Sequence, residues 1–196
     1  MQSDKVTKRE NENWNYPRAA LITGIVVVAA ALRVVPHPMN FAPIGALALF
    51  GGAYFSSKRA AIAVPLLSLV AGDIVTGFHR LIPYVYASFL VSVAIGFWLR
   101  RKKSATRIGS ATLAGAIQFF LITNFALWAS SIGSYPKNLG GLVACYIAGL
   151  PLFWNTLAGD AFYVALLFGG MALAEQRFPS LREPLAADAG QKLAFR

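Results

Sequence analysis

Long apolar runs, separated by short turns or basic clusters, are the feature that most restricts the fold of this chain. A helix rises about 1.5 Å per residue, so a run of 17 residues reaches about 26 Å and crosses most of a bilayer core. A sixth run, residues 44–55, is shorter and rich in Gly and Ala. The pattern predicts an all-α polytopic membrane protein with six transmembrane helices, the second of them short. The five longer runs are residues 19–35, 60–78, 83–99, 108–131 and 153–174.

The scarcity of charge supports this interpretation. Charged residues make up 13% of the chain, about half the share that is usual in soluble domains. Disorder and an ordinary soluble enzyme are therefore disfavoured. The single Cys145 cannot form an internal disulfide and is best read as a small apolar filler.

The positions of the basic residues predict the orientation in the membrane. The chain has 18 Lys and Arg against 8 Asp and Glu, a net charge of +10. If the N-terminus is cytoplasmic, 15 of the 18 basic residues fall on the cytoplasmic side, including the cluster at residues 100–107. Both termini are then expected in the cytoplasm and the protein in the bacterial inner membrane. The basic charge is explained by topology in the lipid bilayer, with no nucleic-acid partner.

Three regions follow from this topology. Residues 1–18 form a polar cytoplasmic tail, residues 19–175 the membrane domain, and residues 176–196 a second cytoplasmic tail. Within the membrane domain, residues 142–150 are apolar but too short to cross and end at Pro151, which predicts an interfacial or re-entrant piece. A cleaved signal peptide is the alternative for the first run. The long polar tail that precedes the run argues against it.

Polar residues inside the spans gather at one depth. Arg33, Asp73 and Asp160 are ionisable, and His37 and His79 lie at span ends. Such residues are costly in a membrane and mark candidate functional sites. Their common level near the outer leaflet predicts a pocket that opens to the outside. The alternative is that Arg33, Asp73 and Asp160 pair with one another and only fix the bundle.

Ten residues are the candidates for binding a substrate in this pocket. Aromatic walls and a few polar groups are typical of ligand sites, although an interfacial aromatic belt would use the same Tyr and Trp residues. The imidazole of His79 is also a candidate metal ligand, or else an ordinary interfacial histidine. The candidates are Asn40, Phe41, Asp73, His79, Tyr84, Tyr86, Asn124, Trp128, Tyr135 and Asn155.

Several stretches resemble the signature of an uncharacterised family of small bacterial membrane proteins. The longest runs from Pro38 through Met39, Asn40, Phe41, Ala42 and Pro43 to Phe55. The resemblance covers about residues 19–170 and implies no function. The shorter matches are residues 64–67, Asn124 and Phe125 with Trp128, Tyr135 and Pro136, and Gly141 and Leu142.

The layout also resembles the substrate-binding S components of energy-coupling-factor vitamin transporters. It is most similar to the small solitary S-component-like family implicated in cobalamin uptake. That resemblance implies six helices, cytoplasmic termini, an outward-open pocket and cobalamin as substrate. Where members of that family carry a cobalt-ligating thiol, this chain has Leu81, with His79 two positions earlier. The residues alike in order and spacing are Gly72 and Asp73, Tyr86 and Ala87, Tyr135 and Pro136, and residues 162–164.

These observations favour a membrane transport protein that binds a vitamin-like small molecule, with a corrinoid as the first expectation. It would have no cofactor of its own, and His79 would face the substrate's cobalt. Transport would use an external ATPase or coupling module, or toppling of the whole bundle. No Walker, HExxH, GxSxG or CxxC motif is present, so an enzyme is not expected. The alternatives are a proton- or ion-coupled carrier using Asp73 or Asp160, and a structural membrane protein.

Overall fold

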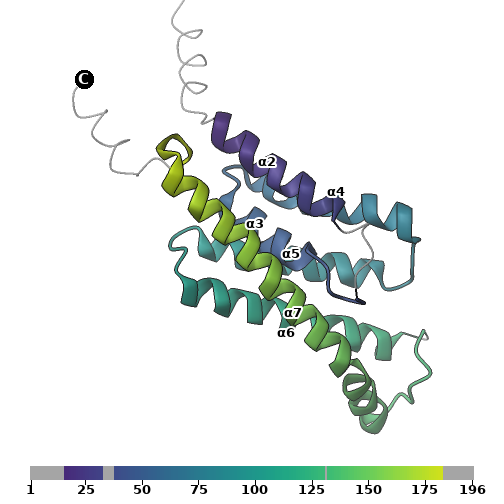
Figure 1. Cartoon of the computed structure of the whole chain (residues 1–196). Coiled ribbons are helices and arrows are strands. Elements are labelled where there is room, and N and C mark those ends of the chain that lie inside the picture. The colour runs from purple at the N-terminus through teal and green to yellow at the C-terminus, as the bar shows by residue number, and fades with distance from the viewer. Residues whose placement is uncertain (1–15, 33–37, 131, 183–196) are drawn as a thin grey trace, which may run out of the picture.

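The computed structural model describes residues 16–32, 38–130 and 132–182. Within these residues every element of secondary structure is a helix, which confirms the expected all-α class, and a helix overlaps each of the six apolar runs (Figure 1). A short 3-10 turn, η1 (Pro179–Leu181), follows the last helix. Arg33, His37 and most of the two expected tails lie outside the described residues. The helices are α2 (Tyr16–Ala31), α3 (Ile44–Tyr54), α4 (Lys58–Thr76), α5 (Ile82–Leu99), α6 (Ala105–Ala129) and α7 (Leu139–Arg177).

Three of these helices are long and apolar enough to cross a membrane. They are α5, α6 and α7, and their length and composition support the expectation of a membrane protein. The apolar helices α2 and α3 are shorter, with 16 and 11 residues. Helix α4 has 19 residues but carries Lys58, Arg59 and Asp73.

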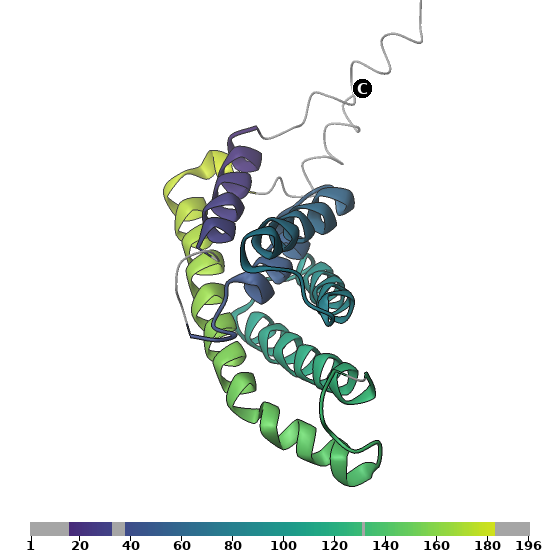
Figure 2. The same ribbon diagram turned by 90° about the vertical axis from the view of Figure 1, so that its right-hand side faces the viewer.

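Helix α7 corrects one expectation. The segment 142–150 was predicted to be a separate piece that ends at Pro151, but α7 is one helix of 39 residues that runs through Pro151. Proline removes one hydrogen bond and bends a helix, and in an otherwise apolar helix it need not end it. Figure 2 shows α7 curved round one side of the molecule, with the other helices on its concave side. The first turn is fixed by Asn138, whose side chain accepts a hydrogen bond of 2.9 Å from the Gly141 N–H.

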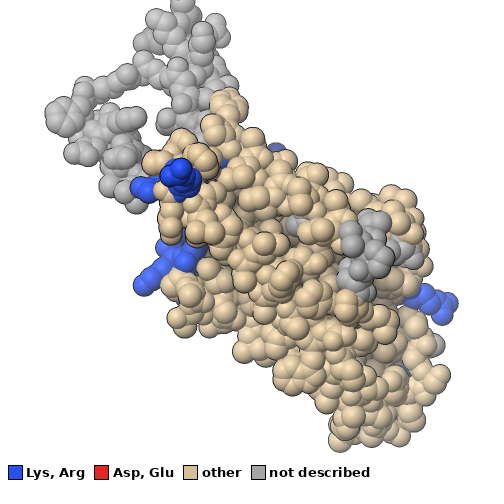
Figure 3. All heavy atoms as spheres, in the orientation of Figure 1, with Lys and Arg blue, Asp and Glu red and all other residues tan. Residues whose placement is uncertain are grey.

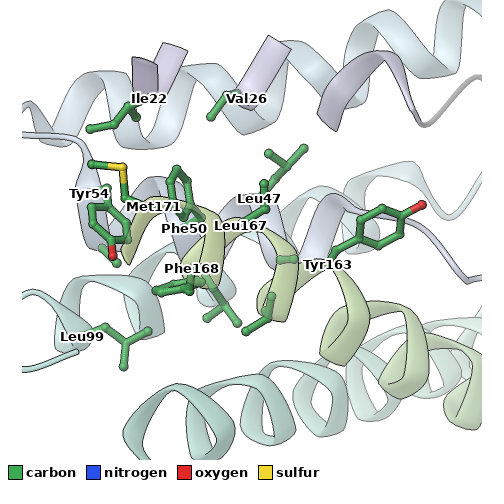
Figure 4. Packing of buried hydrophobic residues seen from close by; sticks show 14 of the residues in the cluster. Ile22, Val26, Leu47, Phe50, Tyr54, Leu99, Tyr163, Leu167, Phe168 and Met171 are labelled. Carbon is green, nitrogen blue, oxygen red and sulfur yellow. The ribbon is translucent and has the colours of Figure 1, made fainter. Parts of the chain in front are cut away.

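Helix α3 is the centre of the bundle. It contacts each of the other five α-helices, and ten of its 11 residues are buried. Figure 4 shows Leu47 and Phe50 of α3 among side chains from α2 and α7, including Val26 and Leu167. An 11-residue helix is about 16 Å long, roughly half of a bilayer core of about 30 Å.

Close packing fixes α3 against α5 near its C-terminus. A Cβ atom on Gly52 would overlap the Val93 carbonyl oxygen and lie 2.8 Å from the Gly96 Cα. Two facing glycines let the helix backbones approach this closely, as is common in membrane bundles. Arg100 then closes the end of α3: its Nε donates to the Gly52 carbonyl at 2.7 Å and its Nη2 to the Phe55 carbonyl at 2.6 Å.

The described basic residues collect at one end of the bundle, which we call the basic end. The start of α2, the turns before α4 and α6, and the end of α7 meet there, and Arg18 pairs with Glu175 at 2.6 Å. Figure 3 shows blue Lys and Arg side chains at that end and an uncharged band across the middle. Arg80 and Lys137 lie on the turns at the opposite end. The basic end holds Arg18, Lys58, Arg59, Arg100, Arg101, Lys102, Lys103, Arg107, Arg177 and Arg182.

Candidate functional site

A cavity of about 430 Å³ lies at the end of the bundle opposite the basic end. It is bounded by the loop before α3, the turn between α4 and α5, and the facing sides of α5, α6 and α7. Its volume falls in the range of about 300–1,000 Å³ that is typical of small-molecule sites. The described lining residues are Asn40, Ala42, Ile44, Gly45, Leu69, His79, Leu81, Val85, Phe89, Ser92, Gly115, Phe119, Phe120, Thr123, Asn124, Leu127, Leu152, Phe153, Thr156 and Asp160.

A non-helical loop, residues 38–43, forms the edge of the cavity beside α7. The Asn155 Nδ2 donates to the Met39 carbonyl at 3.0 Å. One turn later, Gly159 lets the loop approach, because a Cβ there would lie 3.0 Å from the Phe41 Cα. Asn40 has a φ of 63°, the only positive φ among the described non-glycine residues. Asn tolerates this left-handed conformation better than most residues, which lets the chain turn into α3.

Asp160 of α7 caps the first turn of α3. The preceding Pro43 provides no side-chain cap, and the backbone N–H of Ala46 donates to the Asp160 carboxyl group instead. A side chain on Gly45 would overlap this group, since a Cβ there would lie 2.6 Å from Oδ2. Asp160 is 4% exposed, and its carboxyl group faces the positive end of the α3 dipole. Asp160, which is distant from α3 in the sequence, therefore caps the first turn of α3 and also lines the cavity.

Asn124 of α6 is held so that one of its polar atoms is available to a ligand. Its Nδ2 donates to the Phe120 carbonyl at 2.9 Å, and Gly149 of α7 leaves room for the amide, whose Cγ would lie 3.0 Å from an added Cβ. Within the part of the chain that the structure describes, the Asn124 Oδ1 and the side chains of Asn40 and His79 make no hydrogen bond. The cavity therefore presents a carbonyl oxygen, an amide and an imidazole to a solute.

Phenylalanine rings form the apolar walls. Phe89 and Phe119 have ring centroids 5.4 Å apart, and the centroids of Phe120 and Phe153 are 5.2 Å apart. Sequence analysis missed all four, because Phe is frequent throughout the spans and hydropathy does not show which face of a helix is turned inward. A helical projection centred on Asn124 would have placed Phe120 on the same face, since residues four apart lie one above the other.

Below these rings, a polar contact joins α5 and α6. The Gln118 Nε2 donates to the Ser92 Oγ and to the Ser88 carbonyl, each at 3.0 Å. Ser92 lines the cavity, whereas Gln118 stands behind it. The contact fixes the separation of the two helices on which the Phe walls stand.

Of the ten predicted binding residues, the structure brings Asn40, His79 and Asn124 together around the cavity. Asp73 and Tyr86 form a contact between α4 and α5, in which the Tyr86 hydroxyl donates to the Asp73 Oδ2 at 2.6 Å. Asp73 is buried, so this bond stabilises the helix pair.

The other five predicted residues do not line the cavity. Phe41 packs on Phe162 and Tyr163 of α7, with ring centroids 5.9 Å away in each case. Asn155 holds the loop before α3, as described above. The Tyr84 side chain is exposed near the start of α5.

Trp128 and Tyr135 belong to the turn between α6 and α7. The Trp128 Nε1 donates to the Pro136 carbonyl at 2.9 Å, and the Lys137 Nζ donates to the Trp128 carbonyl. Tyr135 is half-buried in the same turn, where a Cβ on Gly133 would lie 2.9 Å from its ring. Trp128 and Tyr135 thus stabilise the turn between α6 and α7.

The charges of the lining restrict the ligand. Asp160 is the one Asp, Glu, Lys or Arg among the described lining residues. No group of three or more His, Cys, Asp or Glu side chains that could hold a metal ion occurs in residues 16–32, 38–130 and 132–182. His79 lines the cavity, and its role as a ligand to a substrate's cobalt stays a prediction.

No curated protein and no solved structure matches this chain. One family model matches residues 13–181, most of the chain, and carries the description "Family of unknown function (DUF6580)". The chain therefore belongs to the DUF6580 family of unknown function.

Proposed function

We propose that the protein is a membrane-embedded binding component for uptake of a small, water-soluble, vitamin-like solute. The observation that carries the proposal is the half-length helix α3, which begins beside the cavity. Non-helical backbone at membrane depth is tolerated where it is buried in protein or lines a water-filled cavity. The loop before α3 has this property, and helices interrupted in this way form the solute sites of many transporters.

The distribution of charge supports an opening toward the outside of the cell. Among the described residues, ten Lys and Arg lie at the basic end and two at the cavity end. The positive-inside rule then assigns the basic end to the cytoplasm. Helices α2 and α4 would cross the membrane beside α5, α6 and α7, and α3 would enter it halfway. Both termini would be cytoplasmic, in the inner membrane.

The lining favours a neutral or cationic solute with hydrogen-bond donors. Asp160, the Asn124 Oδ1 and the Asn40 amide offer acceptors, and the cavity has a carboxyl group with no Lys or Arg beside it. An anion would lack a partner there. The Phe walls suit a flat ring, and their faces also attract a cation.

The size of the cavity restricts whether a corrinoid, the substrate first expected from the sequence, can bind there. A complete corrinoid, with its macrocycle and nucleotide tail, is larger than about 430 Å³. Cobalamin would therefore require the lining helices to separate, with His79 near its cobalt. A smaller heterocycle fits the cavity without this movement and is the substrate class that we favour.

The first test is native mass spectrometry of the full chain, gently purified in detergent, followed by thermal unfolding with a panel of water-soluble vitamins that includes cobalamin. We expect a bound small molecule, and stabilisation by a neutral or cationic member of the panel. Thr123→Phe fills the cavity and should abolish both signals. Leu121→Phe, on the exposed side of the same helix, is the matched control and should keep them. Absence of a bound molecule together with no stabilisation across the panel would contradict the proposal.

A proton-coupled carrier is the alternative in which Asp160 or Asp73 titrates. Asp160 caps α3 and Asp73 bonds Tyr86, so each acid already has a structural use. Uptake into proteoliposomes separates the two mechanisms. Uptake driven by a pH gradient and lost in Asp160→Asn or Asp73→Asn would favour the carrier, because an amide keeps the hydrogen-bond acceptor but cannot exchange the proton.

A further inference from the structure

The cavity ends at a hydroxyl group on its inner side. Ser92 of α5 and Gly115 of α6 are the described lining residues that lie farthest along these two helices toward the basic end. Ser92 is 2% exposed and lies about 15 Å beyond the start of α5 at Ile82. A Cβ added to Gly115 would lie 3.7 Å from the Ser92 Oγ, so the two residues adjoin. We call them the cavity floor.

The hydrogen bonds of the Ser92 hydroxyl group differ from those of the other hydroxyl groups in the lining. A Ser or Thr inside a helix commonly donates to the carbonyl group four residues earlier. Thr123 and Thr156, which also line the cavity, do so at 2.8 and 2.9 Å. Among the residues that the structure describes, the Ser92 Oγ accepts one hydrogen bond and donates none. Its proton is therefore available to a ligand.

Gln118 of α6 accounts for this difference. The carbonyl group four residues before Ser92 belongs to Ser88, and it already accepts from the Gln118 Nε2 at 3.0 Å. The same nitrogen donates to the Ser92 Oγ at 3.0 Å and to the Gly115 carbonyl at 3.1 Å. These acceptors fix the amide, because turning it over would bring its oxygen against two carbonyl oxygens. Since connected hydrogen bonds polarise one another, the bond that Ser92 accepts makes its hydroxyl group a stronger donor.

An acceptor lies one helical turn away from this donor. The Asp160 carboxyl group contacts α3 at Gly45, and the Leu49 Cδ1 would lie 3.9 Å from a Cβ on Gly115 of the floor. Gly45 and Leu49 are about 6 Å apart along α3. The nearest Phe rings of α5 and α6 stand one turn above the floor. The cavity therefore has a donor and an acceptor at different depths, beside aromatic walls.

We propose that the Ser92 hydroxyl group donates a hydrogen bond to the solute and selects molecules with an acceptor at one end and a donor or positive charge at the other. The Asp160 carboxyl group takes the donor end. A heterocycle with an unprotonated ring nitrogen or a ring carbonyl has such an acceptor. Gln118, which does not line the cavity, is a positioning residue. The inference rests on the proposed function and names the substrate class of the same site.

The test compares two probes that differ at one ring position, 4-(aminomethyl)pyridine and benzylamine. Both carry an ammonium group for Asp160, but only the pyridine ring has an acceptor opposite to it. Affinity is measured with the full chain in detergent, from the stabilisation against thermal unfolding as probe concentration rises. We expect wild-type protein to bind 4-(aminomethyl)pyridine about fivefold more tightly than benzylamine, the effect of one ordinary hydrogen bond.

Three variants locate the cause of this preference. Ser92→Ala should lose it and remain folded, because the Gln118 amide keeps two carbonyl acceptors. Gln118→Leu should also lose it while still binding benzylamine, since the Ser88 carbonyl then becomes free to accept from Ser92. Ser88→Ala is the matched control, because it removes a hydroxyl group that donates to the Tyr84 carbonyl and does not line the cavity. It should keep the preference, and unfolding without probe checks that all three variants are folded.

The outcomes separate this inference from the proposed function. Equal affinities of the two probes in the wild type, or a preference that Ser92→Ala retains, would overturn the inference and leave the proposed function standing. Binding of neither probe would also overturn it. If the vitamin panel described above gives no stabilisation and no bound molecule either, the proposed function fails as well.

Discussion

The two ends of α3 are closed in different ways. At the C-terminal end, the α3 and α5 backbones meet at Gly52 and Gly96, and Arg100 donates to two carbonyl groups there. At the N-terminal end, a single carboxyl group from α7 caps the helix, and a cavity of about 430 Å³ adjoins it. The acidic Asp160 at the N-terminal end and the basic Arg100 at the C-terminal end both complement the dipole of α3.

This difference separates the part of the bundle that supports the fold from the part that can bind. At the C-terminal end of α3 the close backbone contacts leave no room for a larger side chain, so a substitution there should change the stability of the fold. At the N-terminal end several acceptors have no donor among the described residues, so a change there should alter binding more than stability. Four substitutions test this division, in order of decreasing effect.

The largest effect on stability is expected at the C-terminal end of α3. Gly52→Ala places a Cβ 2.8 Å from the Gly96 Cα, and neither backbone can move without separating α3 from α5. We expect a loss of about 3 kcal/mol or more in the free energy of unfolding, measured by thermal or denaturant unfolding in detergent. Gly24→Ala, at an open position on α2, should unfold as the wild type does. Equal behaviour of the two variants would show that the close approach is not required.

The next effect comes from the arginine at the same end. Arg100→Met keeps the packing of the side-chain stem but removes both hydrogen bonds to the α3 carbonyl groups. The expected cost is about 2 kcal/mol, read from the same unfolding transition. Arg101→Met, at an exposed neighbour, is the control for loss of charge. An equal cost in both variants would point to net charge as the cause.

A smaller loss of stability is expected at the N-terminal end of α3. Asp160→Ala removes the cap of α3, and the typical cost of losing a helix cap is about 1 kcal/mol. Asp160→Asn should recover most of this stability, because its amide oxygen still accepts from Ala46. A chemical-denaturation series of the two variants measures the difference. If both lose the same amount, the charge of Asp160 is the stabilising feature and the hydrogen bond is not.

The smallest effect belongs to the bond between α4 and α5. Tyr86→Phe removes the hydroxyl that donates to Asp73, and such bonds between membrane helices contribute about 0.6 kcal/mol on average. Unfolding of Tyr86→Phe should therefore shift slightly, while Tyr84→Phe at the exposed position should leave it unchanged. Loss of solute binding in Tyr86→Phe with stability intact would instead place this pair in the binding machinery.

Much of the fold was predictable from sequence because bilayer thickness sets the length of apolar runs. A helix overlaps each apolar run, and the short second run is the short helix α3. The continuity of α7 was not predictable in this way. Pro151 is a strong local signal for a helix end, whereas the neighbouring apolar helices that support the bent helix are distant in sequence.

The site was predictable only in part, for a related reason. Position along each span can be read from sequence, and Asn40, His79 and Asn124, which were expected in one pocket, line the same cavity. The direction in which a side chain points around the helix axis cannot be read from sequence. Trp128 and Asn155 were therefore expected in the pocket, whereas in the structure they donate hydrogen bonds to backbone carbonyl groups beside it. Such bonds use acceptors that every residue has and leave no pattern in the sequence.

The central claim, that the cavity opens on the side away from the cytoplasm, is tested most directly by the accessibility of single cysteines. In a Cys145→Ala background, His79→Cys places a thiol at the cavity, and Lys102→Cys places one at the basic end. Both proteins are treated with a charged, membrane-impermeant maleimide in right-side-out vesicles. The account predicts labelling of His79→Cys in intact vesicles, and of Lys102→Cys only after permeabilisation. The reverse pattern would contradict it.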